Sequence, residues 1–271
     1  MPDRHAPSDP TTDLFSTVRS LARRSTRDKT GRYWFEGVRH FVQACDAGTR
    51  LEAVVTCPKL LKSHVAEVLI RRAKQRGVPV RRVGPEQFRE VSTADRACGV
   101  GAIAVPHWTP LDRADPAAGV GWLVIEHVRS PGNLGTILRT AEAVGVGGVV
   151  FAGPSCDPFA AATVRASMGG LFPLRLCRAS HAAVADWAAA AGMTLVGLSP
   201  DATTRWDRLA DAAPPGRPVA VVLGGERRGL SERSRSLCDV SVSLPMSGTA
   251  DSLNVSVAAG VMLYELQRRG T

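Results

Sequence analysis

The chain contains 271 residues, of which 44% are hydrophobic and 22% charged, and its formal net charge is +9 at pH 7. No apolar run approaches the ~18 residues of a membrane span, and the polar start lacks the apolar core of a signal peptide, so membrane and secreted classes are not expected. The six cysteines form no CxxC pair and no zinc-like spacing with histidine. They predict reduced thiols in a cytoplasmic protein and no metal site.

The first part of the chain is interpreted as a tail followed by a small domain. Residues 1–12 are polar and are expected to be disordered. Short apolar runs then predict a helix at 38–47, a strand at 51–56, a helix at 65–76 and a strand at 78–83. These elements indicate a small αβ domain over 13–106. Residues 107–119 contain two prolines and little periodicity, so they form the expected linker.

The second part, residues 120–271, alternates strand and helix patterns. Strands are predicted at 122–128, 148–152, 174–177, 194–198, 219–223 and 240–244, and helices at 135–144, 159–168, 181–191, 231–237 and 252–268. Such alternation predicts an α/β domain with a mostly parallel sheet covered on both faces. Ligands of such sheets bind at the carboxyl ends of the strands. The loops at 129–133, 198–201, 224–229 and 245–254 are therefore the expected site.

Basic residues gather in two clusters of the first domain. Such clusters either lie on solvated helix faces or bind an acidic polymer, because release of counterions from phosphates drives association. Two clusters within one domain favour the acidic polymer. The clusters consist of Arg19, Arg23, Arg24, Arg27, Lys29 and Arg32, and of Arg71, Arg72, Lys74, Arg76, Arg81 and Arg82.

The first candidate loop runs from residue 130 to residue 139, between a predicted strand and a predicted helix. Gly132 and Gly135 permit close approach of the backbone to a ligand, and Asn133 is a candidate helix cap. Arg139 can reach a phosphate with its bidentate guanidinium. The alternative is a glycine turn with a surface arginine. The loop matches neither GxGxxG nor the Walker pattern, which disfavours a dinucleotide site.

The second candidate loop follows the strand predicted at 219–223. Gly224 and Gly225 again permit close backbone approach, and Glu226 follows them directly. Between these glycines and the cations Arg227 and Arg228, the Glu226 carboxylate is expected to be ionised. The alternative is a turn with a solvated cluster of charges.

The third candidate loop begins at Pro245, which ends a strand. Ser252 is a candidate cap of the last helix, and Asn254 lies in its first turn. The alternative is a strand break and a helix cap with no further role. Small residues follow at 256 and 258–260, which suits close helix packing.

In this order and spacing, the three loops closely resemble the three motifs of the SpoU/TrmH family, the RNA 2′-O-ribose methyltransferases of the SPOUT class. Asn133 and Arg139 match the first motif, Glu226 the second, and Ser252 with Asn254 the third. The resemblance covers roughly residues 120–269. More loosely, the segments at 33–37 and 98–103 resemble the L30e-like RNA-binding domain that precedes the catalytic domain in many members.

The resemblance implies a fold, a cofactor and roles for individual residues. The sheet is expected to carry a deep trefoil knot, and the protein to form a homodimer whose pocket draws on both subunits. Arg139 is expected to orient or help deprotonate a ribose hydroxyl, and the other motif residues to position that arginine, the RNA and the sulfonium. The expected catalytic residues are Arg139, Asn133, Glu226, Ser252 and Asn254. The residues expected to bind S-adenosylmethionine are Leu198, Leu223, Gly224, Gly225, Leu244, Met246, Ser252 and Leu253.

The expected substrate is RNA, with 23S ribosomal RNA favoured by the L30e-like domain. Arg165 matches an arginine of the ribosomal-RNA methylases of antibiotic producers, so a role in antibiotic resistance is also possible on this resemblance. The other expected RNA contacts are Arg23, Arg24, Arg27 and Arg32. The alternatives are a tRNA 2′-O-methyltransferase, a base-directed RNA methyltransferase and a non-catalytic RNA-binding platform.

Overall fold

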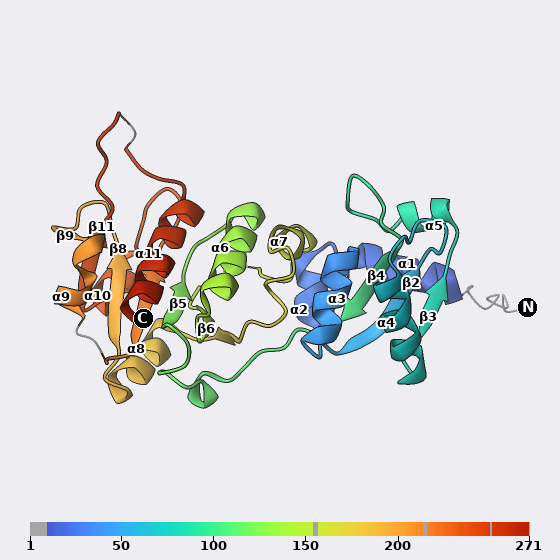
Figure 1. Cartoon of the computed structure of the whole chain (residues 1–271), viewed down its shortest axis with the longest axis horizontal. Helices are drawn as coiled ribbons and strands as arrows, with labels where there is room; N and C mark the ends of the chain where they lie inside the picture. Colours follow the sequence, from blue (N-terminus) through green and yellow to red (C-terminus); the bar gives the residue numbers. More distant parts are fainter. Residues whose placement is uncertain (1–9, 154–156, 214–215, 250, 271) are drawn as a thin grey trace, which may run out of the picture. The chain divides into compact units, whose positions relative to one another are not determined.

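The computed structural model describes residues 10–153, 157–213, 216–249 and 251–270 (Figure 1). The chain forms two compact units, one of residues 1–106 with 159–165 and the other of residues 107–158 with 166–271. Helix α1 (Pro10–Ser20) begins inside the predicted tail, whose residues 1–9 lie outside the described part. None of the described helices combines the length and apolar character needed to cross a bilayer.

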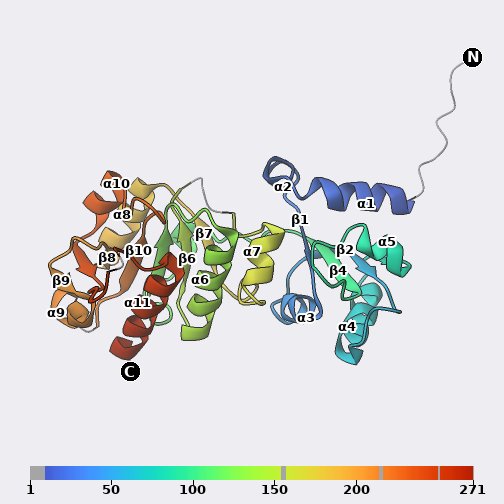
Figure 2. The same cartoon turned by 90° about the horizontal axis from the view of Figure 1, so that it is seen from above.

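The first unit is built on a four-stranded sheet in the order β1-β4-β2-β3. Only β2 and β3 pair in parallel. Its strands are β1 (Tyr33–Glu36), β2 (Leu51–Thr56), β3 (Val80–Arg82) and β4 (Val100–Ala104), and its helices are α1, α2 (Arg24–Thr30), α3 (Val38–Asp46), α4 (His64–Gln75), α5 (Pro85–Arg89) and most of α7 (Ala161–Ala166). Helices α3 and α4 cover one face of the sheet and α1 and α5 the other (Figure 2). Both predicted helices and both predicted strands of this unit are confirmed, with ends shifted by one or two residues.

Arg27 corrects one expected RNA contact. Its side chain is buried, and its guanidinium donates to the carbonyl oxygens of Leu21 and Ala22 at 2.6 and 2.8 Å. These carbonyls lie just beyond the end of α1, where backbone acceptors lack helical partners. Arg27 therefore satisfies the chain's own backbone and is not available to a phosphate.

The second unit is built on a seven-stranded sheet in the order β7-β6-β5-β10-β8-β11-β9, in which every described pairing is parallel. The predicted α/β class with a parallel sheet is confirmed. The strands are β5 (Trp122–Ile125), β6 (Gly148–Phe151), β7 (Leu176–Arg178), β8 (Thr194–Leu198), β9 (Thr204–Arg205), β10 (Val219–Leu223) and β11 (Val240–Ser243). The helices are α6 (Pro131–Val144), α8 (His181–Ala190), α9 (Leu209–Ala212), α10 (Glu232–Leu237) and α11 (Val255–Gly270), with short 3-10 turns at Leu111–Arg113 and Trp206–Arg208.

Helices cover both faces of this sheet. Helices α6 and α11 pack together on one face, and α8 and α10 on the other (Figure 2). The strands between them are buried, as the near-continuous apolar runs of β5 and β10 require. Since all strands run in parallel, their carboxyl ends meet at one edge, where the candidate loops begin.

The starts of α6 and α11 correct two predicted caps. Ser130, not Asn133, caps α6, because its Oγ accepts from the Asn133 backbone N–H and Pro131 occupies the first helical position. At α11, the Asn254 Oδ1 accepts from the Ser256 N–H at 2.8 Å, so Asn254 takes the capping role expected of Ser252.

Candidate functional site

The candidate site lies where the loops after β5 and β10 run side by side. These two central strands pair in register up to Ile125 and Leu223, so both chains leave the sheet at the same level. The β5 loop leads into α6, and the β10 loop leads into α10. Each loop carries one carboxylate close to the sheet edge, Glu126 and Glu226.

Glu226 of the β10 loop is held by donors of the β5 loop. It accepts from the backbone N–H groups of Arg129 and Ser130 at 3.3 and 3.0 Å, and from the Asn133 side-chain amide at 2.9 Å. Partial burial would raise the pKa of Glu226, but these three donors outweigh it and hold the pKa below its usual range. Glu226 is therefore a fixed anion at neutral pH.

Asn133 extends this network to the last helix. Its Oδ1 accepts from the Asn254 amide at 3.0 Å, while the Asn254 Oδ1 accepts from the Ser256 N–H and hydroxyl. Glu226, Asn133 and Asn254 thus form a continuous hydrogen-bonded chain across 121 residues of sequence. The structure brings together three of the five residues predicted to be catalytic.

Arg139 and Ser252 are not joined to this chain of hydrogen bonds. Arg139 lies on α6, six residues beyond Asn133, and its side chain is exposed. Within the described ranges, its guanidinium forms no ion pair or hydrogen bond, so it is available to an incoming group. Ser252 is exposed in the segment before α11.

Glu126, the carboxylate of the β5 loop, is a site residue that was not predicted from the sequence. Its side chain is only 3% exposed. It accepts from the Ser231 hydroxyl at 2.6 Å and the Ser231 N–H at 3.4 Å, and the His181 Nε2 lies 3.1 Å from it and 3.1 Å from the Ser234 hydroxyl. Burial would raise the pKa of Glu126, but the hydroxyls of Ser231 and Ser234 outweigh it and the pKa lies below its usual range. The available signal was a carboxylate directly after four apolar residues, where the prediction continued the strand to residue 128.

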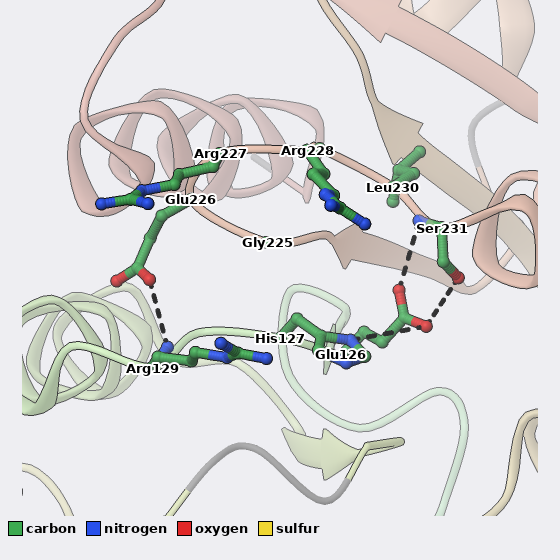
Figure 3. Close-up of a pocket in the computed structure, with 10 residues that line it drawn as sticks. Glu126, His127, Arg129, Gly225, Glu226, Arg227, Arg228, Leu230 and Ser231 are labelled. Atoms are coloured by element: carbon green, nitrogen blue, oxygen red, sulfur yellow. Dashed lines mark hydrogen bonds and ion pairs between the residues drawn. The ribbon is translucent and has the colours of Figure 1, made fainter.

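The two carboxylates bind the two loops reciprocally (Figure 3). Glu126 of the β5 loop holds Ser231 at the end of the β10 loop, and Glu226 of the β10 loop holds the backbone of the β5 loop. We call this pair of contacts the carboxylate clamp. Because each loop is fixed by the other, neither can move without breaking the partly buried hydrogen bonds of Glu126 and the exposed ones of Glu226.

A pocket of about 990 Å³ lies between the clamped loops. Its lining carries both carboxylates, three arginines and one histidine (Figure 3). The lining residues are Glu126, His127, Arg129, Gly225, Glu226, Arg227, Arg228, Gly229, Leu230 and Ser231.

The residues predicted to bind the cofactor lie at the ends of three neighbouring strands. Gly224 and Gly225 follow β10, Leu198 ends β8, and Leu244 follows β11. Gly225 and Gly229 exchange backbone hydrogen bonds of 2.8 and 3.0 Å, which closes the β10 loop into a tight backbone ring. Leu223 is buried, while Met246 and Leu253 are exposed large apolar residues near the same edge.

The remaining predicted RNA contacts lie in the first unit and its associated segment. Arg23 is exposed, Arg24 pairs with Asp28, and Arg32 pairs with Glu52. The exposed Arg165 donates to the Thr93 carbonyl at 3.0 Å. Apart from Arg27, these side chains reach solvent.

Comparison with known proteins adds sequence and structural relatives. The model of the SpoU rRNA Methylase family matches residues 122–264, and an MRM3-like substrate binding domain matches residues 16–102. A 23S rRNA (uridine(2479)-2′-O)-methyltransferase of Streptomyces viridochromogenes is 31% identical over 255 residues, covering 92% of this chain and 87% of the relative.

Solved structures match over nearly the whole chain. The AdoMet-bound rRNA methyltransferase from Sinorhizobium meliloti is 29% identical with a TM-score of 0.85, covering 98% of this chain and 97% of the other. The SpoU methyltransferase AviRb from Streptomyces viridochromogenes, in complex with the cofactor AdoMet, is 29% identical with a TM-score of 0.81, covering 95% and 97%.

The backbone ring of the β10 loop predicts a strong effect of Gly224→Ala. A methyl group at Gly224 would collide with the Gly229 carbonyl and the Leu230 nitrogen, both backbone atoms that cannot rotate away. We expect the free energy of unfolding to fall by about 1–3 kcal/mol, as in overpacked sites. Gly248→Ala, which meets nothing within 4 Å, is the matched control. Urea unfolding followed by circular dichroism measures both, and equal stability of the two variants would refute the ring's importance.

The carboxylate clamp also predicts that part of the free energy of unfolding is lost in acid. The pKa of Glu126 and that of Glu226 are lowered in the folded state, so their stabilisation is complete above the unfolded carboxyl pKa of ~4.3 and is lost as pH falls through the lower folded values. We expect the double variant Glu126→Gln/Glu226→Gln to be less stable at neutral pH and to lose less stability on acidification. The control is Glu142→Gln, at an exposed site on α6. Parallel stability–pH curves for the double variant and the native chain would contradict this expectation.

Proposed function

Since the chain belongs to the SpoU rRNA methylase family, we propose that it methylates a ribose 2′-hydroxyl of 23S ribosomal RNA with S-adenosylmethionine. The family predicted from the three loops is confirmed by the match over residues 122–264. The protein is an RNA methyltransferase that uses S-adenosylmethionine. We propose, in addition, that the methylated position is a ribose 2′-hydroxyl and that the substrate is 23S ribosomal RNA. We place the reaction in the cytoplasm.

The observation that carries this proposal is the chain of hydrogen bonds from Glu226 through Asn133 to Asn254, with Arg139 exposed on the same helix as Asn133. This chain fixes the first turn of α6 to the first turn of α11 at the carboxyl edge of the sheet. A transfer reaction depends on such fixed geometry, because alignment of the two reacting atoms supplies a substantial part of the rate enhancement.

The residues at the strand ends fit S-adenosylmethionine. The backbone ring of Gly225 and Gly229 offers amide and carbonyl groups to polar parts of the cofactor, and Met246 and Leu253 offer exposed apolar surface to the adenine ring. Leu198 and Leu244 lie at the neighbouring strand ends between these two regions. When bound, the cofactor supplies an electrophilic methyl group on sulfur.

Arg139 acts on the ribose by electrostatics. A guanidinium stays protonated at neutral pH and does not accept a further proton. Arg139 can bind a phosphate of the target nucleotide and stabilise the alkoxide that develops on the 2′-oxygen, while the phosphate takes the proton. Glu226 and Asn133 keep the start of α6, and with it the base of Arg139, in a fixed position. Ser252 is exposed near this turn and is proposed to contact the substrate or cofactor.

Ribosomal RNA is supported as the substrate by the first unit. Residues 16–102 match an MRM3-like substrate binding domain, and a relative 31% identical is named for 23S ribosomal RNA. That relative comes from a Streptomyces species, which supports a role in antibiotic resistance as a further hypothesis.

Arg139→Ala tests the proposed mechanism. We expect methyl transfer to ribosomal RNA to fall roughly 10²-fold or more, because a donor to the developing charge is lost. Binding of S-adenosylmethionine, measured by isothermal titration calorimetry, should stay near that of the native chain. The control is Arg175→Ala, at an exposed site near β7. Transfer by Arg139→Ala at the native rate would refute the mechanism, and failure of the native chain to bind the cofactor would favour a non-catalytic RNA-binding platform.

We also propose that the protein is a homodimer through α11. Leu253, Val257 and Tyr264 expose 41%, 53% and 58% of their surface on or just before this helix, and Gly260 lies among them. Large apolar side chains around a glycine suit close packing of a second copy's helix. The trefoil knot expected of this family stays a prediction.

The double variant Val257→Asp/Tyr264→Asp tests the dimer. We expect it to sediment as a monomer in analytical ultracentrifugation, because two carboxylates would be desolvated in the interface. Val65→Asp is the control, since Val65 is 57% exposed on α4 of the first unit. A native chain that sediments as a monomer, or a double variant that still dimerises, would refute the α11 interface.

A further inference from the structure

The pocket between the clamped loops has a basic wall that the catalytic chain of hydrogen bonds does not use. Arg129 comes from the β5 loop and Arg228 from the β10 loop, and both side chains extend toward the end of the pocket where Glu126 contacts Ser231 (Figure 3). His127 lies between them at this end, while Arg227 points the opposite way (Figure 3). Two different loops therefore direct guanidinium groups into one space.

These guanidinium groups form no direct ion pair with the carboxylates of the pocket, although the charge of Arg129 helps to lower the pKa of Glu226. In the part of the chain that the structure describes, Arg129, Arg227 and Arg228 form no ion pair within 4 Å. The two carboxylates of the pocket are bound elsewhere, Glu226 by amide N–H groups and Glu126 by hydroxyls and an N–H beside His181. Three arginines against two carboxylates leave the pocket with excess positive charge, which an incoming anion can neutralise.

We propose that this pocket binds the RNA backbone next to the target ribose, with Arg129 and Arg228 as its phosphate ligands. The inference rests on the proposed function and assigns a subsite to it. A guanidinium binds phosphate through two parallel hydrogen bonds, which gives both affinity and orientation. The volume of about 990 Å³ accommodates a nucleotide with its phosphate, well beyond a single small ion.

The basic wall of the pocket favours RNA over the cofactor as its occupant, and Gly225 and Gly229 form the part of the lining that borders the proposed cofactor site. Glu226 lines the pocket and also begins the hydrogen-bonded chain to Asn133 and Asn254. If the reacting ribose lies beside the hydrogen-bonded residues Glu226, Asn133 and Asn254, the next phosphate of the RNA strand would lie beyond Glu226, at the basic wall. S-adenosylmethionine carries two positive groups, a sulfonium and an ammonium, and one negative carboxylate. Its net charge is therefore positive, and the arginines repel it.

The carboxylate clamp makes this subsite preformed. Arg129 lies three residues after Glu126, and Arg228 lies between Glu226 and Ser231, so the clamp holds the backbone close to both arginines. A preformed site loses less free energy to ordering when the ligand binds.

Salt dependence of RNA binding tests the proposal in the full-length chain. The probe is a short fluorescein-labelled single-stranded RNA of mixed sequence, titrated over a range of salt concentrations. Each lost phosphate contact should make the slope of log K against log salt shallower by ~0.7. The affinity of the variant relative to that of the native chain should then fall about fivefold for each tenfold decrease in salt. Arg228→Gln should lose one such contact and Arg129→Gln/Arg228→Gln two. Arg233→Gln, at an exposed site on α10 outside the pocket lining, is the matched control and should keep the native slope.

Two further readouts separate this inference from the proposed function. With ribosomal RNA as substrate, Arg228→Gln should raise KM for RNA while kcat and the calorimetric affinity for S-adenosylmethionine stay native. An unchanged slope and KM in the double variant would overturn the subsite, and a large loss of cofactor affinity would show that the pocket holds S-adenosylmethionine instead. If the native chain transfers no methyl group, the proposed function fails, and the salt slopes still decide whether the pocket binds RNA.

Discussion

The reciprocal hold between the β5 and β10 loops is the constraint on which the rest of the site depends. Two parallel strands that pair in register deliver two loops to one edge, and each loop carries a carboxylate that binds the other. Each carboxylate accepts hydrogen bonds from the opposite loop. Glu126 depends on Ser231, and Glu226 depends on the backbone of Ser130. The clamp therefore forms only when the whole centre of the sheet is assembled.

This constraint links stability to chemistry. Glu226 of the β10 loop holds Asn133, and Asn133 holds Asn254 in turn. The β10 loop therefore fixes the position at which α11 begins. Arg139 is carried on the helix whose first turn is held in this way. The same loops present Arg129 and Arg228 to the pocket. A single network thus sets the geometry of the reacting group, the cofactor edge and the proposed phosphate contacts.

Sequence alone predicted much of this arrangement because the relevant patterns are local. Alternating apolar runs and helical periodicity identified the parallel sheet, and the glycines and polar residues after each strand identified the loops. The order of Asn133, Glu226 and Asn254 along the chain then identified the family. The cap of α6 was misplaced because both Ser130 and Asn133 are good capping residues, and only the geometry of Pro131 at the first helical position decides between them.

The remaining features depend on contacts between distant positions, which no local pattern contains. Glu126 meets His181 and Ser231 across 55 and 105 residues, so its donors could not be identified from its neighbours. Arg27 belongs to a basic run that looks solvated, yet it is buried because the carbonyls at the end of α1 need a donor. Residues 159–165 were assigned to the catalytic domain by chain order, although they pack with the first unit, where Phe159 contacts Tyr33 at a ring separation of 4.7 Å.

The most direct test of the account is the chemical position of the transferred methyl group. Ribosomal RNA methylated by the native chain with radiolabelled S-adenosylmethionine can be hydrolysed in alkali, which cleaves only beside a free 2′-hydroxyl. The account predicts that the label remains in alkali-resistant dinucleotides. Label released in mononucleotides that carry a methylated base would contradict ribose methylation by this site.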